Sequence, residues 1–221
     1  MLPLLYSLTA VIAYAVCAVN PAIVLSRLIY HEDVRHAGSG NAGFTNFKRV
    51  YGAKYAWLVF LCDVMKGMLV FFAAGAAFSY VLGSRQLGIA YAGVFAMLGH
   101  TCPIYYGFRG GKGFLVCATL IWFLDWRAGL VTTALFLLLL FGAKYMSLAS
   151  MCSMLGGVAA LIFFGASPAV CVLFGGCAAF MIFRHRSNIV RLCRGTESRF
   201  TLGHARGTEP AGEATENDGN H

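Results

Sequence analysis

Long apolar runs dominate this sequence and restrict the folds that it can adopt. The runs at residues 2–29, 55–82 and 87–106 each reach the length of about 20 residues that an α-helix needs to cross a bilayer. Of the 221 residues, 59% are hydrophobic and 12% are charged, which is far too apolar for a soluble domain of this size. The sequence therefore predicts an all-α, polytopic membrane helix bundle.

About seven membrane spans are expected from these runs. Two of them are short, and we interpret them as oblique helices separated by an interfacial linker, Asp125-Trp126-Arg127. The first span contains Asn20-Pro21, which is expected to kink it. Merging the two short helices would give six spans, which is the less favoured alternative. The expected spans cover residues 2–29, 55–82, 87–106, 114–124, 130–141, 147–164 and 168–183.

Basic residues cluster between the apolar runs, at residues 27–54, 109–112, 144 and from 184 onward. Cytoplasmic loops of membrane proteins carry such an excess of lysine and arginine. This distribution predicts an external N-terminus and a cytoplasmic C-terminus. We expect one membrane domain, residues 1–200, followed by a polar and disordered tail, residues 201–221.

The formal net charge of +8 does not indicate a nucleic-acid-binding protein, because basic residues are not interleaved over one folded surface. The eight cysteines are scattered through apolar runs without a Cys-x-x-Cys pair. We interpret them as small packing residues rather than disulfides or metal ligands. No group of residues has metal-ligand spacing, so neither a metal nor a cofactor is expected.

The stretch Gly99–Gly113, GHTCPIYYGFRGGKG, places five glycines, a histidine, an arginine and a lysine between apolar runs. Glycine allows backbone N–H groups to approach an anion closely, and a nearby lysine adds positive charge. Gly110-Gly111-Lys112-Gly113 is therefore predicted to form a phosphate cradle. The spacing is not that of a Walker loop, and a plain interhelical turn is the alternative.

Two further polar segments are candidates for anion binding. Residues 38–49 combine glycines, hydroxyls and amides, and Arg49 at their end can hold a phosphate with two parallel hydrogen bonds. A helix-capping loop is the alternative there. In residues 185–197, His185 and Asn188 share a helical face. A basic helix that contacts anionic lipid is the alternative for this segment.

Together the three segments resemble the bacterial acylphosphate:glycerol-3-phosphate acyltransferases. That family carries Ser-Gly-Asn-x-Gly-x-Thr-Asn-x-x-Arg, then Gly-His-x-x-Pro followed by Gly-Gly-Lys-Gly, then His-Arg-x-Asn-x-x-Arg-Leu-x-x-Gly-x-Glu. These motifs match residues 39–49, 99–113 and 185–197 in the same order, and the resemblance covers residues 3–198. Residues 63–67 and 145–150 also look like the family.

The chain departs from the family pattern at a few apolar positions. Ala18-Val19 precedes Asn20-Pro21 where Gly-Ser is usual, Cys102 replaces an aromatic residue, and Phe114 stands where a smaller residue is usual. We expect these changes to alter the wall of the acyl-chain pocket and to leave the polar chemistry intact.

The resemblance implies a multi-pass enzyme of the bacterial cytoplasmic (inner) membrane whose site faces the cytoplasm. It implies transfer of a long acyl chain from acyl phosphate to the sn-1 hydroxyl of glycerol-3-phosphate, giving lysophosphatidic acid and phosphate in the first step of phospholipid synthesis. The implied partners are these substrates, membrane lipid and a soluble enzyme that produces acyl phosphate, without nucleic acid. A transporter of phosphorylated small molecules is the competing hypothesis, although no internal repeat is evident.

The site residues follow from the matched motifs. The implied catalytic residues are Ser39, Arg49, Lys112, His185 and Asn188. The implied substrate-binding residues are Gly38, Gly40, Asn41, Thr45, Asn46, His100, Gly110, Gly111, Gly113, Ser150 and Arg191. Whether the two histidines act as bases or as hydrogen-bonding scaffolds is left open by the sequence. Asp63 and Lys66, three positions apart, are favoured as a structural ion pair.

The histidine spacing bears on the acyl donor. Membrane acyltransferases that use thioesters commonly place an aspartate five residues after a histidine, whereas here only His204 has a carboxylate at that distance, Glu209. An acyl phosphate has an activated carbonyl, and its phosphate oxygens can accept the hydroxyl proton. The sequence therefore predicts direct use of acyl phosphate, with the protein supplying mainly positioning and anion stabilisation.

Overall fold

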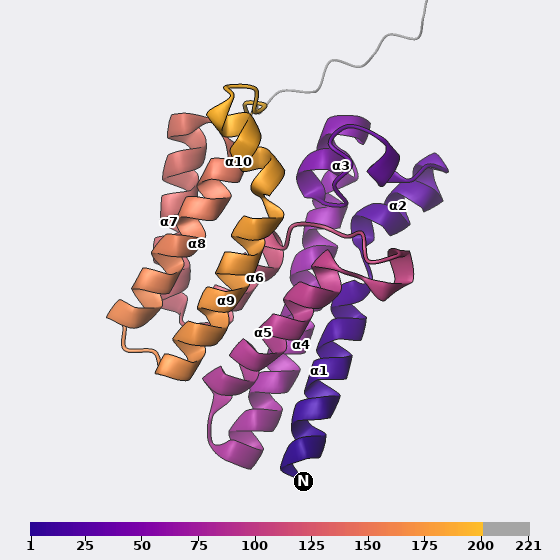
Figure 1. Ribbon diagram of the computed structural model, residues 1–221. Coiled ribbons are helices and arrows are strands. Elements are labelled where there is room, and N and C mark those ends of the chain that lie inside the picture. The colour runs from indigo at the N-terminus through magenta and orange to yellow at the C-terminus, as the bar shows by residue number, and fades with distance from the viewer. Residues whose placement is uncertain (201–221) are drawn as a thin grey trace, which may run out of the picture.

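The computed structural model describes residues 1–200, and within that range the chain is helical without β-strands (Figure 1). The tail predicted to be disordered, residues 201–221, lies outside the described residues. The elements are α1 (Leu2–Ala18), α2 (Pro21–Tyr30), η1 (Val34–His36), α3 (Phe44–Tyr51), α4 (Ala56–Leu82), α5 (Arg85–Thr101), η2 (Ile104–Tyr106), α6 (Phe114–Leu124), α7 (Trp126–Ala143), α8 (Met146–Phe163), α9 (Pro168–Arg184) and α10 (Arg186–Cys193).

Five helical segments of the described chain are long and apolar enough to cross a membrane. These are residues 2–30, counting α1 and α2 together, and α4, residues 85–106, α7 and α8. The pair α9 and α10 adds a sixth if its bend of 57° lies within one span. Helix α6, with 11 residues, is shorter than a full crossing, as expected for this segment. Five or six spans are thus supported, and the seventh remains a prediction.

The linker expected at Asp125-Trp126-Arg127 is instead the start of α7, so the expected boundary at residue 130 was wrong. The Asp125 carboxylate accepts hydrogen bonds from the backbone N–H groups of Arg127 and Ala128. An aspartate in this position satisfies the free N–H groups of a first helical turn. The helix therefore begins at Trp126 and runs for 18 residues, the length of a candidate span.

The expected interruption at Asn20-Pro21 is confirmed as a break between α1 and α2. Asn20 caps α2 by accepting from the Ile23 N–H at 3.1 Å, and its amide donates to the Ala42 carbonyl at 3.1 Å. The carbonyl of Val19, freed by the break, accepts a hydrogen bond of 2.8 Å from Lys66 Nζ. The break thus ties the first span to α4 and to the polar segment that contains residue 42.

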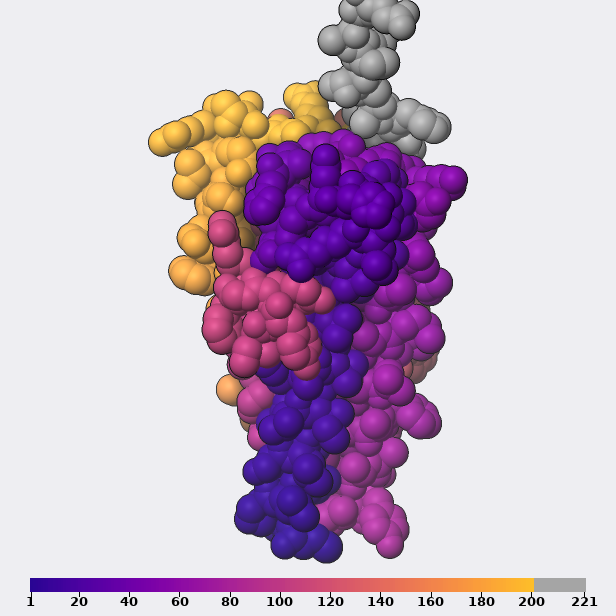
Figure 2. All heavy atoms as spheres, turned by 90° about the vertical axis from the view of Figure 1, so that its right-hand side faces the viewer, coloured from indigo at the N-terminus to yellow at the C-terminus, as the bar shows by residue number. Residues whose placement is uncertain are grey.

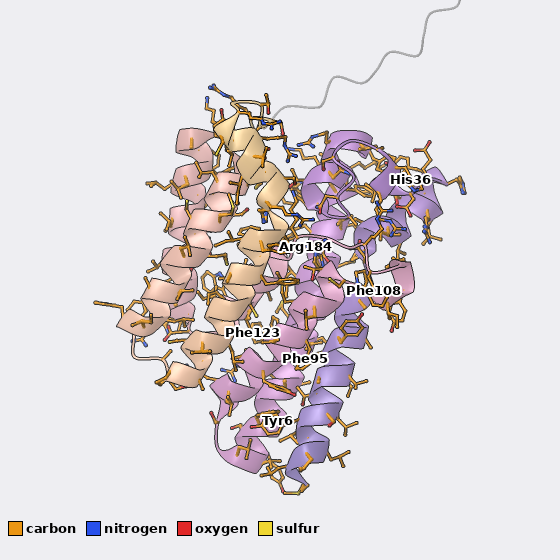
Figure 3. All side chains as sticks on the ribbon, viewed as in Figure 1. Tyr6, His36, Phe95, Phe108, Phe123 and Arg184 are labelled. Carbon is orange, nitrogen blue, oxygen red and sulfur yellow. The ribbon has the colours of Figure 1, made fainter. Side chains whose placement is uncertain are left out.

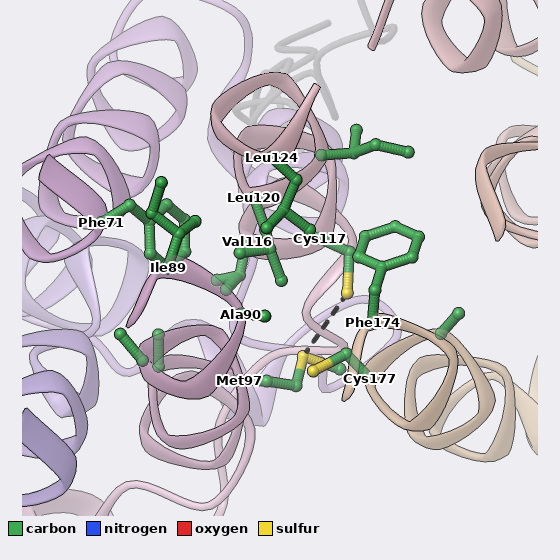
Figure 4. Close-up of a cluster of buried hydrophobic side chains, with 14 of the residues drawn as sticks. Phe71, Ile89, Ala90, Met97, Val116, Cys117, Leu120, Leu124, Phe174 and Cys177 are labelled. Carbon is green, nitrogen blue, oxygen red and sulfur yellow. Dashed lines mark hydrogen bonds between the residues drawn. The ribbon is translucent and has the colours of Figure 1, made fainter. Parts of the chain in front are cut away.

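The larger apolar core joins α1, α4, α5, α6, α7, α8 and α9 (Figure 4). Small residues bring α5 and α6 close together, since a Cβ at Gly93 would lie 2.4 Å from the Leu120 side chain. Near the same contact Met97, Cys117 and Phe174 pack as fully buried side chains. Close packing of small residues is the expected source of stability where lipid surrounds the helices.

Large apolar side chains also cover the outside of the bundle. Leu69 and Phe72 on α4, Leu138 on α7 and Val172 on α9 are between 64% and 73% exposed. On a soluble protein such surfaces would promote association, whereas in a bilayer they contact acyl chains. This distribution supports the predicted membrane bundle.

The polar segments gather at one end of the bundle. In Figure 1, α2, α3 and α10 lie at the top, while the N-terminus lies at the bottom. Figure 2 shows residues 30–50, the loop after α5 and the C-terminal segment together at this end. A second apolar cluster of Ala22, Ile23, Val34, Ala42, Phe47, Ala56 and Val59 fixes α2 and α3 there.

Candidate active site

A cavity of about 300 Å³ opens where the three predicted segments meet. The segment before α3, the loop between α5 and α6, and the α9–α10 bend all contribute to its wall. The prediction that the three motifs share one site is thereby supported by their position. The lining residues are Ser39, Gly40, Asn41, Phe108, Arg109, Gly110, Lys112, Arg184, Arg186, Ser187 and Arg191.

The cavity is strongly positive. Its lining includes five basic side chains and no aspartate or glutamate, namely Arg109, Lys112, Arg184, Arg186 and Arg191. A concave site lined by charges of one sign concentrates ligands of the opposite sign. Arginine also matches the geometry of phosphate oxygens with pairs of N–H donors. The arrangement suits an anionic ligand, and phosphate in particular.

Lys112 is held by a chain of hydrogen bonds to α10 and the residues after it. Lys112 Nζ donates to Asn188 Oδ1 at 2.5 Å, and Asn188 Nδ2 donates to Glu197 Oε1 at 2.7 Å. Glu197 also accepts from Ser147 Oγ and from Arg191 Nε, both at 2.7 Å. Burial, together with the positive charge of Arg191, lowers the pKa of Lys112 to about 8. Asn188 therefore orients the Lys112 ammonium, and nearby negative charge compensates its positive charge only in part.

The segment before α3 is organised by Asn46, which is 1% exposed. Asn46 Oδ1 accepts from Ser39 N at 2.7 Å and from Ser39 Oγ at 3.0 Å. Its Nδ2 donates to the carbonyls of Val34 and Ala37 at 3.1 and 3.0 Å. The amide predicted to bind substrate is thus fully used inside the protein, which corrects that prediction. Asn46 instead presents Ser39 to the cavity.

The glycines of the phosphate cradle do not aim their N–H groups at the cavity, contrary to the prediction. Gly110 N donates to the Thr101 carbonyl at 3.2 Å, and Gly111 N donates to the His100 carbonyl at 3.1 Å. The glycines are needed for close approach, because a Cβ at Gly111 would lie 2.2 Å from His100 Nε2. The loop therefore folds down onto the end of α5, and Lys112 supplies the charge.

Neither predicted histidine lines the cavity. His100 is 4% exposed, and its Nδ1 lies 3.2 Å from Lys66 Nζ and 3.4 Å from Asp63 Oδ1. Asp63 and Lys66 form the expected ion pair at 2.7 Å. His185 Nδ1 lies 2.8 Å from the Met181 carbonyl, so this nitrogen carries the proton and donates. Both imidazoles thus support the backbone around the cavity from within the bundle.

Other predicted residues lie near the cavity without lining it. Arg49 is exposed on α3 and donates to Ser198 Oγ at 2.8 Å, and Thr45 lies exposed one turn earlier. Gly38 and Gly113 have φ angles of 60° and 86°, which glycine adopts without strain. Ser150 is 2% exposed and donates to the Met146 carbonyl of its own helix, so it is not brought to the cavity.

Sequence reasoning missed several lining residues: Phe108, Arg109, Arg184, Arg186 and Ser187. Arg186 is itself a matched motif position, and the other four lie within two residues of one, which was the available signal. Arg184 is the most informative, because its Nε is buried without a hydrogen-bond partner. Its Nη2 donates to the Gly111 carbonyl at 3.3 Å.

A larger hollow of about 590 Å³ lies at the ends of α5, α6 and α7 that face away from the cavity, and none of the predicted site residues lines it. Of its charged lining residues, Asp125 and Arg127 are already paired at 2.8 Å, and Arg85 is the third. Size alone does not make this hollow the reaction site. The smaller cavity contains the convergent cations, so it is the better candidate.

Comparisons with known proteins show the family of the chain. The sequence profile of the family described as "Glycerol-3-phosphate acyltransferase" matches residues 7–195. A glycerol-3-phosphate acyltransferase of Thermoanaerobacter pseudethanolicus is 36% identical over 192 residues, 87% of this chain and 94% of that protein. Its counterpart in Lactiplantibacillus plantarum is 33% identical over 193 residues, with 87% and 91% covered.

Solved structures show the same fold. The crystal structure of PlsY (YgiH), an integral membrane glycerol 3-phosphate acyltransferase, in its glycerol 3-phosphate form has a TM-score of 0.82 and 30% identity, covering 89% of this chain and 96% of that one. The lysophosphatidic acid form of the same enzyme has a TM-score of 0.79 and 29% identity, covering 89% and 95%.

Proposed function

The chain belongs to the glycerol-3-phosphate acyltransferase family and acylates glycerol-3-phosphate, and we propose that its acyl donor is a long-chain acyl phosphate used directly. The primary hydroxyl of glycerol-3-phosphate attacks the carbonyl carbon of the donor. A new ester C–O bond forms, the bond from the carbonyl carbon to the phosphate oxygen breaks, and lysophosphatidic acid and inorganic phosphate leave.

The observation that carries this proposal is the cluster of five basic side chains around one cavity that lacks a lining carboxylate. Both proposed substrates carry a phosphate, so two dianionic groups meet at the reacting centre. A site with one or two cations would leave much of that charge uncompensated in a partly buried space. The positive charge of five cations can balance the negative charge of two dianionic phosphates. A thioester donor would bring no phosphate to the reacting carbonyl.

The fate of the proton supports the same donor. A thioester reaction calls for a base oriented by a carboxylate at the reacting centre, yet His185 bonds a backbone carbonyl. His100 lies 3.4 Å from Asp63, but it is 4% exposed below the loop and does not line the cavity. An acyl phosphate can take the hydroxyl proton on its own phosphate oxygen as that group leaves. Ser39 Oγ donates to Asn46, so its lone pairs are free to accept from the substrate hydroxyl and orient it. The side chains then provide positioning and charge stabilisation.

Within this mechanism the residues contact substrate or add charge near it, hold the contacting groups in place, or shape the loops. Lys112 and Asn188 contact the glycerol-3-phosphate, and Arg191 and Arg49 add positive charge near them. Asn46, His100, His185 and Glu197 hold the contacting groups in place through buried hydrogen bonds. Gly38, Gly40, Gly110, Gly111 and Gly113 give the loops their shape, and Asn41 completes the wall.

We also propose that α6 is a short seventh crossing and that the cavity faces the cytoplasm of a bacterium with an inner membrane. The polar end that holds the cavity is rich in arginine and lysine, which favours the cytoplasmic side. Met1 lies at the opposite end of the bundle from α10 (Figure 1), as an external N-terminus and a cytoplasmic C-terminus require. A soluble enzyme that makes acyl phosphate would then reach the cavity from the cytoplasm.

The donor is tested with detergent-purified protein, labelled glycerol-3-phosphate and three donors of equal chain length: acyl phosphate, acyl-CoA and acyl carrier protein thioester. We expect lysophosphatidic acid from acyl phosphate alone, with one inorganic phosphate released per product. Comparable turnover with acyl-CoA would overturn the donor proposal while leaving the acceptor unchanged. Truncation after Phe200, which removes His204 and Glu209, should leave the activity with acyl phosphate intact.

A further inference from the structure

Arg184 carries a buried donor that has no acceptor within the described part of the chain. Its Nε has no hydrogen-bond partner, and its Nη2 makes one long bond of 3.3 Å to the Gly111 carbonyl. The other unbonded buried atom among the described residues is Asp63 Oδ1, which is paired with Lys66 at 2.7 Å. A buried N–H group without an acceptor is costly, and more so when it is charged. Arg184 therefore needs an acceptor that residues 1–200 do not provide.

The other cations of the cavity are engaged differently. Arg191 is paired with Glu197 at 2.7 Å, Lys112 donates to Asn188, and the guanidinium of Arg186 lies over the Phe183 ring at 5.1 Å. Among the described residues, no carboxylate lies within the 4.0 Å ion-pair distance of Arg184. A partly buried guanidinium surrounded by other cations is stabilised best by a bound anion. The geometry points to an anion at this position.

The depth of Arg184 indicates which anion this is. Arg184 ends α9, and Asn188 lies in α10, beyond the 57° bend between the two helices. Its partner Gly111 lies on the inner side of the loop, directly over His100. Figure 3 shows Arg184 at the polar end, with Phe95 and Phe123 below it in the bundle. Arg184 thus lies at the end of α9, on the bundle side of the bend, whereas Asn188 lies beyond the bend.

We propose that Arg184 binds the phosphate of the acyl donor and the inorganic phosphate that leaves, while Lys112 and Asn188 bind glycerol-3-phosphate. A long acyl chain lies among apolar helices, so the phosphate attached to it is presented from the membrane side. Glycerol-3-phosphate is water-soluble and enters from the polar end. This assignment rests on the proposed function, because it assumes an acyl phosphate donor.

The assignment also explains the unpartnered Nε of the guanidinium. Nε and Nη2 share one edge and can donate to two oxygens of one phosphate in parallel. Negative charge grows on this phosphate as its bond to the carbonyl carbon breaks and it takes up the hydroxyl proton. A donor pair aimed at that phosphate stabilises the transition state more than the ground state. Arg184 is accordingly a substrate-contacting residue for the donor.

The test compares R184Q and R184K with R194Q, which changes an exposed arginine directly after α10 that does not line the cavity. The KM for acyl phosphate and for glycerol-3-phosphate are measured separately, together with inhibition by inorganic phosphate. We expect R184Q to raise the KM for acyl phosphate and the inhibition constant of phosphate by about tenfold or more, because a charge-assisted contact is lost. The KM for glycerol-3-phosphate should change less than about threefold. R184K should recover part of the loss, and R194Q should match the wild type.

Two outcomes would overturn the assignment while the wild type still uses acyl phosphate. One is an equal rise in both KM values, which would place Arg184 in general folding of the site. The other is unchanged inhibition by phosphate in R184Q. Gel filtration and thermal unfolding show whether R184Q folds. If it does not, the same comparison is made with R184K. Inhibition of R184K by phosphate that equals the wild-type value would then refute the assignment of Arg184 to the donor phosphate. A wild type that does not turn over acyl phosphate would instead refute the donor proposal itself.

Discussion

Replacing Glu197 with glutamine tests the hydrogen-bond chain that orients Asn188 toward Lys112. The Glu197 side chain is 6% exposed, and it accepts hydrogen bonds of 2.7 Å from Asn188, Ser147 and Arg191. Glutamine keeps the shape, but one of its two terminal atoms becomes an NH₂ donor. That donor must face either the Arg191 Nε–H or the Asn188 amide. One hydrogen bond is therefore lost whichever way the new amide turns.

The expected size follows from the charge of the lost contact. A hydrogen bond to a charged group contributes about 1.5–3 kcal/mol, and the lost contact leaves a donor facing a donor. We expect E197Q to lower the free energy of unfolding by about this amount. Asn188, no longer fixed on both sides, holds Lys112 less well. The value of kcat/KM for glycerol-3-phosphate should therefore fall roughly 10- to 100-fold.

Thermal unfolding in detergent and steady-state kinetics measure the two effects separately. Glu32→Gln is the matched control, because this exposed carboxylate has a single described side-chain contact, Tyr51 Oη at 3.4 Å. Wild-type kinetics in a folded E197Q protein would show that the Lys112–Asn188–Glu197 chain does not position the substrate. Equal losses in E197Q and Glu32→Gln would attribute the effect to net charge.

Two further predictions concern single side chains, Lys112 and Ser150. The pKa of Lys112, lowered from 10.5 to about 8 by burial and by Arg191, means that the ammonium loses its proton as the pH rises through about 8. The KM for glycerol-3-phosphate should therefore rise about tenfold per pH unit above that point, and a flat profile from about pH 7 to pH 9.5 would contradict a binding role for this charge. Ser150 donates to the Met146 carbonyl within α8, so Ser150→Ala should leave kcat/KM within about twofold of wild type. A tenfold loss would return Ser150 to the substrate-binding set.

Much of the fold was predictable because it depends on local composition and local breaks. The apolar runs locate the helices, and Asn20-Pro21 breaks the first span because proline cannot donate and asparagine caps. The boundary of α7 was missed for the same kind of local reason. Asp125 was interpreted as an interfacial charge, whereas its carboxylate caps the helix that begins at Trp126. A composition rule cannot distinguish these two roles of one residue.

The roles of the motif residues were harder to predict than their location. Asn46 and Ser39 lie seven positions apart in one motif, and both were expected to contact substrate. The structure turns Asn46 inward, where four hydrogen bonds use both its amide atoms. A buried amide with satisfied partners specifies a loop conformation rather than a ligand contact. Motif membership alone does not show on which side of the loop a side chain lies.

The charged part of the site depends on contacts that no local pattern contains. Lys112 with Asn188, Gly111 with Arg184, and Arg49 with Ser198 join positions that are 76, 73 and 149 residues apart. Each contact links α3 or the loop between α5 and α6 with the part of the chain from the end of α9 onward. The glycines of the central loop matter because they permit this approach. A Cβ at Gly111 would collide with His100 and lift the loop away from α5. The Gly111 carbonyl that Arg184 contacts and the Lys112 ammonium that Asn188 holds would move with the loop.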